Sequence, residues 1–232
     1  MNRERVERAT VTLTKKGGRG VLTTDNLILT AAHCIDFKTT GEMTLGEHFI
    51  ETIRTASGEE CAVRPLAVEP LADIAVLGAL DEQEFPPHIV ESFETFCDAT
   101  EPVPVCANVP ALFKPFSVCI FTHKRTWIEG TAKLMDRYAS KFFVRVNEPI
   151  EGGTSGSPIV NKRGELVGIV CDSGTTEELA SHGYVSVGAS PLPGALPLWM
   201  WWKNSHKFEA RDRRKIKQFM AQARTRFQHP EK

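Results

Sequence analysis

The sequence has no apolar run of the roughly 20 residues that a membrane-spanning helix needs. Its first eight residues are followed by no apolar core of the kind that a secretory signal requires. No two of its cysteines stand in the C-x-x-C spacing that favours a zinc site. These absences argue against a membrane span, secretion and a metal centre, and they predict a cytoplasmic protein without metal or organic cofactor.

What is present is ordinary for a globular protein: 41% of the 232 residues are hydrophobic and 25% are charged. This length suffices for one large or two small domains with a substantial core. An even number of cysteines suggests disulfides only in an oxidising compartment, which the N-terminus does not indicate. We therefore interpret the six cysteines as reduced, mostly buried thiols: Cys34, Cys61, Cys97, Cys106, Cys119 and Cys171.

Charge is unevenly distributed along the chain. Residues 203–232 contain ten Lys and Arg against three Asp and Glu, a net charge of +7, whereas the preceding residues carry a net charge of −8. Three of the four tryptophans precede this basic stretch, in residues 198–202, and its apolar residues recur near helical spacing. We expect a basic amphipathic C-terminal helix over residues 203–232. Two interpretations stay open: packing on the protein's own core, or docking of a regulatory partner or an anionic surface, with nucleic acid ranking last among the partners.

Short β-forming runs separated by Gly, Pro and charged residues dominate the rest of the chain. Evenly spaced strands of this kind indicate a barrel or a sandwich, not a parallel α/β sheet. The stretch 81–110 is acidic, contains proline and shows little periodicity, which is typical of an interdomain linker. We expect strands over residues 10–15, 21–24, 27–30, 49–54, 61–68, 74–77, 116–122, 127–134, 142–146, 166–171 and 184–187, and a further strand that begins with the apolar residues 159–160.

One loop carries the clearest chemical signal: Gly-Gly-Thr-Ser-Gly-Ser-Pro at residues 152–158, followed at once by apolar β-formers. A serine hydroxyl is a poor nucleophile unless a base takes its proton. Glycine allows the backbone angles that direct successive N–H groups into one small cavity. The amides of Gly153 and Ser155 would there hold the negative oxygen that develops when a carbonyl is attacked. The loop therefore predicts Ser155 as a nucleophile with a histidine and an acid elsewhere.

Both partners are present upstream. Thr-Ala-Ala-His-Cys at residues 30–34 ends an apolar strand in His33, and Asp73 opens another buried-looking strand. Each motif alone has a plain structural interpretation, as a turn, a core histidine or a cap, because short motifs match by chance. Their order His33, Asp73, Ser155 is the order in chymotrypsin-like proteases. Ser157 lacks a following glycine, so we assign Ser155 as the nucleophile.

These residues resemble the trypsin/chymotrypsin superfamily over roughly residues 10–190. The histidine motif looks trypsin-like, whereas the segments around Asp73 and Ser155 are closer to HtrA-type proteases, here without a PDZ-like extension. The resemblance implies an all-β fold of two antiparallel six-stranded Greek-key barrels with a C-terminal helix. On this basis we expect a first barrel in residues 1–82, a linker in 83–112, a second barrel in 113–202 and the helix in 203–232.

The same resemblance suggests where a substrate side chain would bind. Trypsins select basic residues with an aspartate six residues before the nucleophile, and here that position is Pro149. Cys171, Ser173 and Gly183 would line the pocket walls. The resemblance thus predicts a pocket for a small or medium apolar side chain.

Activation by a released N-terminus has no sequence support. In trypsin-like zymogens the new N-terminus pairs with an aspartate just before the nucleophile, but that residue is Thr154 here. A buried ammonium group without a partner would be strongly unfavourable. We therefore expect a serine endopeptidase that needs no N-terminal processing, acts on peptide or protein substrates and is controlled by loop ordering or a partner. The alternative is a protease-fold binding or scaffold module with little turnover.

Overall fold

The computed structural model of the chain describes residues 1–35, 50–69, 72–106, 114–133, 141–172 and 184–189. The chain divides into two compact units, residues 1–196 and 197–232, and every described residue belongs to the first. The expected helix over residues 203–232 and the tryptophans before it lie outside the described residues.

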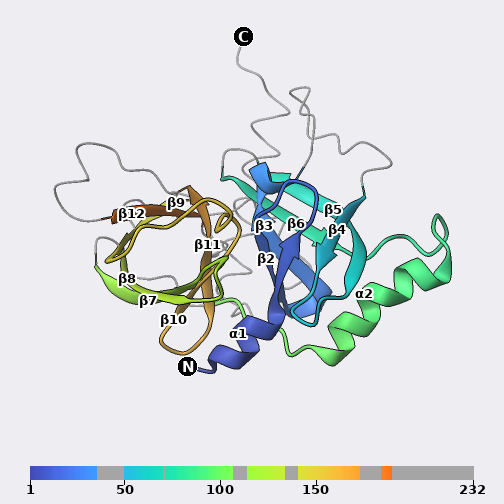
Figure 1. The fold of residues 1–232 in the computed structure, drawn as a ribbon, viewed down its shortest axis with the longest axis horizontal. Helices are drawn as coiled ribbons and strands as arrows, with labels where there is room; N and C mark the ends of the chain where they lie inside the picture. Colours follow the sequence, from blue (N-terminus) through green and yellow to red (C-terminus); the bar gives the residue numbers. More distant parts are fainter. Residues whose placement is uncertain (36–49, 70–71, 107–113, 134–140, 173–183, 190–232) are drawn as a thin grey trace, which may run out of the picture. The chain divides into compact units, whose positions relative to one another are not determined.

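The first six strands close into a barrel, drawn in blue to cyan in Figure 1. They are β1 (Thr10–Leu13), β2 (Arg19–Thr23), β3 (Leu27–Ala31), β4 (Glu51–Arg54), β5 (Glu60–Glu69) and β6 (Ile74–Gly78). Their antiparallel order is β1-β2-β3-β6-β5-β4, and pairing of β1 with β4 closes the barrel.

Six further strands form a second closed barrel, drawn in green to orange in Figure 1. They are β7 (Phe116–Phe121), β8 (Trp127–Lys133), β9 (Lys141–Val146), β10 (Pro158–Asn161), β11 (Leu166–Asp172) and β12 (Tyr184–Ala189). Around this barrel the order is β7-β8-β9-β12-β11-β10, with β10 paired to β7. The two barrels thus share one topology although the sequence has no visible repeat, and the predicted double-barrel fold is confirmed.

Alternation of side chains explains why these segments form barrel strands. Along β5 the residues Cys61 and Val63 are buried, whereas Glu60 and Leu66 are exposed. Successive side chains of a strand point to opposite faces, so such a strand fills a barrel interior with one set and covers its surface with the other. The second barrel has an apolar core to which β7, β8, β9, β10 and β11 contribute: Val118, Ile120, Ile128, Ala132, Phe142, Val144, Val146, Ile159, Val167 and Val170.

The hairpin between β2 and β3 has a backbone that its turn residues favour. Asp25 and Asn26 have φ angles of +64° and +54°. Asn and Asp tolerate this left-handed region better than other side chains do, and a tight hairpin between twisted strands requires it. The register that follows, with Leu22 opposite Ile28, carries the chain to the strand end where His33 lies.

Two helices were missed by the strand-centred interpretation of the sequence. Helix α1 (Arg3–Ala9) is capped by the Asn2 side chain, buries Val6 and Ala9, and precedes the first strand directly. Seven residues are too few for a clear periodic pattern, and a helix this short is stable only through tertiary contacts. One of these is the indole Nε1 of Trp127, which donates to Glu7 Oε1 at 2.7 Å.

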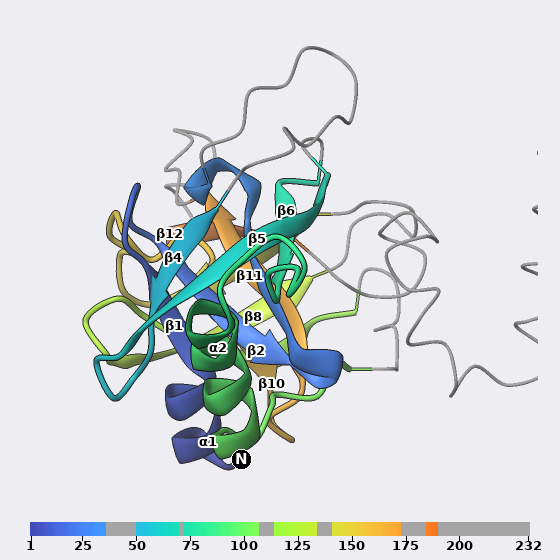
Figure 2. The same ribbon diagram turned by 90° about the vertical axis from the view of Figure 1, so that its right-hand side faces the viewer.

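The second helix lies within residues 83–112, the expected linker, where the sequence showed little periodicity. Helix α2 (Pro87–Ala99) packs on β5, as Figure 2 shows, and buries Val90, Phe93, Phe96 and Cys97. These four positions recur at intervals of three, three and one residues, which places them on one helix face. The acidic residues between them obscured this pattern. No helix in the described part of the chain is long and apolar enough to cross a membrane.

The segment after α2, residues 103–106, is hydrogen-bonded to both barrels. Val103 donates its N–H to Leu22 of β2 at 2.9 Å, and Cys106 donates to Leu166 of β11 at 2.8 Å. Because one short extended segment bonds to a strand of each barrel, it restricts the movement of one barrel against the other.

Candidate active site

The pairing of β3 with β6 brings His33 to Asp73. Ala31 lies opposite Ile74 in this antiparallel pair, so the residues that follow Ala31 and precede Ile74 are neighbours. His33 Nδ1 lies 2.8 Å from Asp73 Oδ2, and the His33 backbone N–H donates to Asp73 Oδ1 at 3.0 Å. The carboxylate therefore fixes both the ring and the backbone of the histidine.

Asp73 is itself held by contacts from both barrels. Its φ is +56°, a left-handed angle that costs a non-glycine residue about 1–2 kcal/mol. Its carbonyl oxygen accepts from the N–H of Ala32 at 3.1 Å, and the thiol of Cys171 on β11 donates to the same oxygen at 3.6 Å. These bonds compensate the strained backbone and aim the carboxylate at His33.

Ser155 lies in the tight loop before β10. Gly153 and Gly156 on either side of it have φ angles of +87° and +78°. Gly156 donates its N–H to Val170 of β11 at 2.6 Å, and Val170 donates to Ser157 at 2.9 Å. The loop is thus tied to the sheet directly after Ser155, where the sequence predicted an abrupt change from loop to strand.

Burial distinguishes the two serines of this loop. Ser155 is half-buried, whereas Ser157 is fully buried and its hydroxyl has no hydrogen-bond partner among the described residues. A substrate cannot reach a hydroxyl that solvent cannot reach. Access therefore favours Ser155. Its Oγ forms no hydrogen bond with another described residue, as is common for catalytic groups before substrate binds.

Gly18 lies between the serine loop and Cys34, the residue that follows His33. A Cβ atom placed on Gly18 would lie 2.5 Å from Cys34 Sγ and 3.1 Å from Ser155 O. The next residue, Arg19, donates its N–H to Ser155 O at 2.7 Å. The histidine and the serine thus come from different barrels but border the same turn of the first barrel.

The side chain of Arg19 reinforces this contact between barrels. It is 8% exposed, its guanidinium lies 5.5 Å from the centre of the Phe121 ring, and its Nη1 donates to Thr12 Oγ1 at 3.2 Å. Burial, with a smaller contribution from Arg125, lowers the pKa of Arg19 from its ordinary value. Nothing in the sequence marked this arginine beyond its place in a glycine-rich turn.

The backbone amides predicted to bind an oxyanion are available for that purpose. Among the described residues, none accepts a hydrogen bond from the N–H of Gly153 or Ser155. By contrast, the intervening Thr154 donates its N–H to Glu151 O at 3.3 Å. Two unpaired donors separated by one turn residue are suited to holding a single anionic oxygen.

The predicted specificity residues are only partly visible. Pro149 is exposed just before the serine loop. Cys171 is 3% exposed, and its sulfur faces the carbonyl oxygens of Ala72 and Asp73. Ser173 and Gly183 lie outside the described residues. The substrate pocket that these four residues would form therefore stays a prediction.

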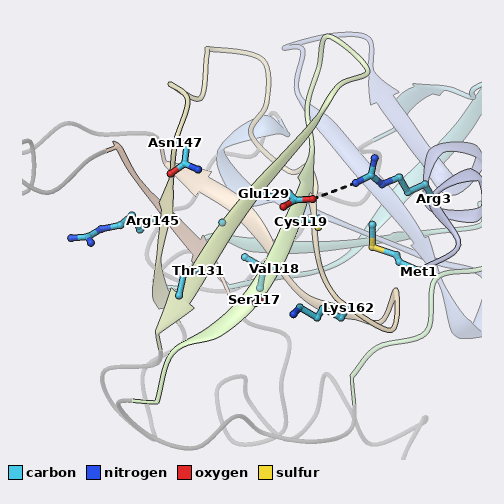
Figure 3. A pocket seen from close by; sticks show the side chains of 11 residues that line it. Met1, Arg3, Ser117, Val118, Cys119, Glu129, Thr131, Arg145, Asn147 and Lys162 are labelled. Carbon is cyan, nitrogen blue, oxygen red and sulfur yellow. Dashed lines mark ion pairs between the residues drawn. The ribbon is translucent and has the colours of Figure 1, made fainter.

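A separate pocket opens on the second barrel, away from these groups. Figure 3 shows side chains of β7 and β8, with Arg3 of α1 and Lys162, around it. Arg3 pairs with Glu129 there at 3.7 Å. The lining includes none of His33, Asp73 and Ser155. Within the described part of the chain, no three His, Cys, Asp or Glu side chains gather as a metal ion would require.

The sequence matches the family model of the trypsin-like peptidase domain over residues 18–169. The chain belongs to this family. The matched range contains His33, Asp73 and Ser155, together with the strands that carry them.

Solved structures with a similar fold include two bacterial proteases. The Rv3671c protease of M. tuberculosis H37Rv, as a serine-to-alanine mutant in its inactive form, shares 12% identity at a TM-score of 0.52, with 88% of this chain and 91% of that chain covered. The serine endoprotease from Yersinia pestis shares 19% identity at a TM-score of 0.52, with 81% of this chain and 60% of that one covered. At such identities the likeness shows the fold alone. No curated protein matches the sequence.

In this trypsin-like peptidase domain, sequence reasoning missed one polar contact beside the serine loop. His123, in the turn between β7 and β8, lies with its Nδ1 2.9 Å from Thr154 Oγ1. The sequence signal was weak, because a single histidine in a polar turn is ordinarily only a solvated residue. Its position became evident only when the turn and the serine loop were seen together.

The His33–Asp73 bond has a predictable effect on titration. The hydrogen bond to Asp73, followed by one to Cys34, raises the pKa of His33 from 6.5 to about 10. Only the neutral imidazole can accept a proton, so we expect kcat/KM to keep rising above pH 7 instead of levelling off near the ordinary histidine value of about 6.5. NMR titration of the His33 ring measures the pKa directly. Asp73→Asn should lower it toward 6.5, and an unchanged value in that variant would contradict this cause.

The same shift predicts the sign of a stability effect. A folded-state pKa above the unfolded value means that protonated His33 stabilises the fold below about pH 6.5, and that this contribution is lost as pH rises through the folded-state value. The stability difference between the wild type and Asp73→Asn should therefore shrink on going from neutral to alkaline pH. Because half of the His33 side chain is exposed, solvent screening keeps this difference small.

Proposed function

We propose that the protein is a serine endopeptidase in which Ser155 is the nucleophile, His33 the general base and Asp73 the residue that orients the imidazole. The observation that carries the proposal is the 2.8 Å contact between His33 Nδ1 and Asp73 Oδ2. This contact leaves Nε2 as the ring nitrogen that can accept the Ser155 proton. The family supports a peptidase, and the carboxylate–imidazole pair supports the assignment of the roles.

The proposed reaction follows from these groups. Ser155 Oγ attacks the peptide carbonyl while its proton moves to His33 Nε2, and the amides of Gly153 and Ser155 bind the oxyanion. Collapse of the intermediate breaks the C–N bond, and His33 gives its proton to the departing amine. Water then hydrolyses the acyl-enzyme by the same steps, with His33 again acting first as base and then as acid. Every proton is accounted for without a metal or an organic cofactor.

The N-terminal helix supports activity without N-terminal processing. Residues 3–9 form α1, Arg5 of this helix bonds to Glu101 and to the Gly164 carbonyl oxygen, and Met1 lines the pocket of Figure 3. Thr154 offers no charge with which a released ammonium group could pair. Control by a partner through residues 198–232, and a cytoplasmic location, are further parts of the proposal.

Labelling with a fluorophosphonate probe tests the function directly. We expect the full chain to be labelled at Ser155, with Ser157→Ala labelled equally and Ser155→Ala not at all. Cleavage of a peptide library by the same preparations would report the residue preferred before the scissile bond, for which we expect small or medium apolar side chains. Absence of labelling and cleavage at every pH tested would instead favour a protease-fold scaffold.

A further inference from the structure

The side chain of His123 lies against the serine loop. Its Nδ1 lies 2.9 Å from Thr154 Oγ1 and its Nε2 lies 3.9 Å from Glu151 Oε2. A Cβ atom placed on Gly153 would lie 3.7 Å from the ring, in ordinary contact. The ring thus contacts the loop at Thr154 and lies near Glu151, and it leaves room beside Gly153.

The contact with Thr154 is the one that bears on the chemistry. Thr154 is fully buried and lies between the two amides assigned to the oxyanion. A buried hydroxyl without a partner is costly, so the Thr154 side chain is held where His123 can bond to it. Thr154 also accepts the N–H of Ser157 at 3.0 Å, which fixes the same turn through its backbone. The direction of the Gly153 and Ser155 amides therefore depends on the place of Thr154.

The turn that carries His123 is well braced. Thr122 donates its N–H to Thr126 O at 2.9 Å, the hydroxyls of the same two residues lie 2.7 Å apart, and Arg125 donates to Thr122 O at 3.0 Å. The flanking residues Phe121 and Trp127 are paired in the barrel. A rigid hairpin of the second barrel thus presents the imidazole to the loop.

The outer contact of the ring is weaker. Glu151 is exposed and bonds to Lys124 Nζ at 2.5 Å, and this bond lowers the pKa of the Glu151 carboxyl. Exposed ion pairs contribute little to stability. The bond to the buried Thr154, not the ion pair with Glu151, is therefore the contact that can orient the loop.

We propose that His123 is a positioning residue that keeps the oxyanion-binding amides in their working direction through its hydrogen bond to Thr154. This hydrogen bond would stabilise the loop at Thr154, whose hydroxyl carries no charge and can form no ion pair. The inference rests on the proposed function of Ser155 and its neighbouring amides.

The kinetic test removes the bond from either side. We expect His123→Phe and Thr154→Val each to lower kcat by about 10- to 100-fold with KM changed less than about twofold, because the amides act mainly on the transition state. The kcat of the double variant should be little lower than that of either single variant, because both substitutions remove the same hydrogen bond. His123→Asn should recover most of the activity, because its amide reaches the position of the ring Nδ1. His88→Phe, an exposed histidine on α2, is the matched control.

Hydrogen exchange supplies a measurement that does not need activity. His123→Phe should speed exchange of the Thr154, Gly156 and Ser157 amides at least about tenfold, while amides of β7 and β11 keep their protection. Unchanged exchange in the serine loop, or wild-type kcat in both single variants, would overturn the role of His123 and leave the peptidase proposal standing. A wild type that neither cleaves peptides nor reacts with the fluorophosphonate probe would overturn the peptidase proposal, whereas the exchange result would still decide whether His123 holds the loop.

Discussion

Ser155→Ala and His33→Ala are each expected to lower kcat by about 10⁴-fold or more. In the proposed mechanism Ser155 is the nucleophile and His33 takes its proton when the carbonyl is attacked, so each variant lacks one of the two groups. Because the two groups act in one step, the double variant should be little slower than either single variant. Steady-state hydrolysis of the best library peptide measures the three losses, and circular dichroism confirms that each variant is folded.

Ser157→Ala is the matched control for this experiment. Ser157 is fully buried directly before β10, and its hydroxyl has no partner among the described residues, so its removal should leave kcat within about threefold of the wild type. Appreciable activity in Ser155→Ala together with its loss in Ser157→Ala would show that the wrong serine had been assigned. Additive losses in the double variant would contradict a joint action of Ser155 and His33.

Gly156→Ala is expected to have the largest effect of any conservative change in the loop. A Cβ atom there would overlap the carbonyl oxygen of Arg19 and lie 2.7 Å from Thr30 Oγ1, and the φ of +78° is itself unfavourable for alanine. Backbone contacts of this kind cannot be relieved by rotating a side chain. We expect a loss of about 2–4 kcal/mol in the free energy of unfolding and a Tm lower by roughly 5–15 °C.

Activity should fall further than stability alone explains. Gly156 follows Ser155 directly, and a displacement of the nucleophile by about 1 Å can cost about 100-fold in rate. Gly152→Ala is the control, because a Cβ atom at Gly152 meets nothing within 4 Å and its backbone angle is not one that disfavours alanine. Equal Tm and kcat in Gly156→Ala and the wild type would show that the loop does not lie against the first barrel.

The strands were predictable because their evidence is local. The β-forming run Cys61–Val68 and the turn residues Asp25 and Asn26 each express the structure of their own neighbourhood. The serine motif is equally local, since its glycines are needed for backbone angles within the same loop. The spacing of Val90, Phe93 and Cys97 is equally local evidence for helix α2, but the acidic residues between them obscure it.

What the sequence by itself determined, then, is which segments become strands and which residues can carry the chemistry. The tertiary structure alone decided which residues far apart in the sequence come into contact. His33 reaches Asp73 through the register of β3 with β6, and Ser155 reaches the first barrel through Gly18 and Arg19. His123 meets Thr154 only because β7 and β10 are neighbours in a closed barrel. The physical reason is that strand register and barrel closure minimise the free energy of the whole core, so no single segment of sequence contains them.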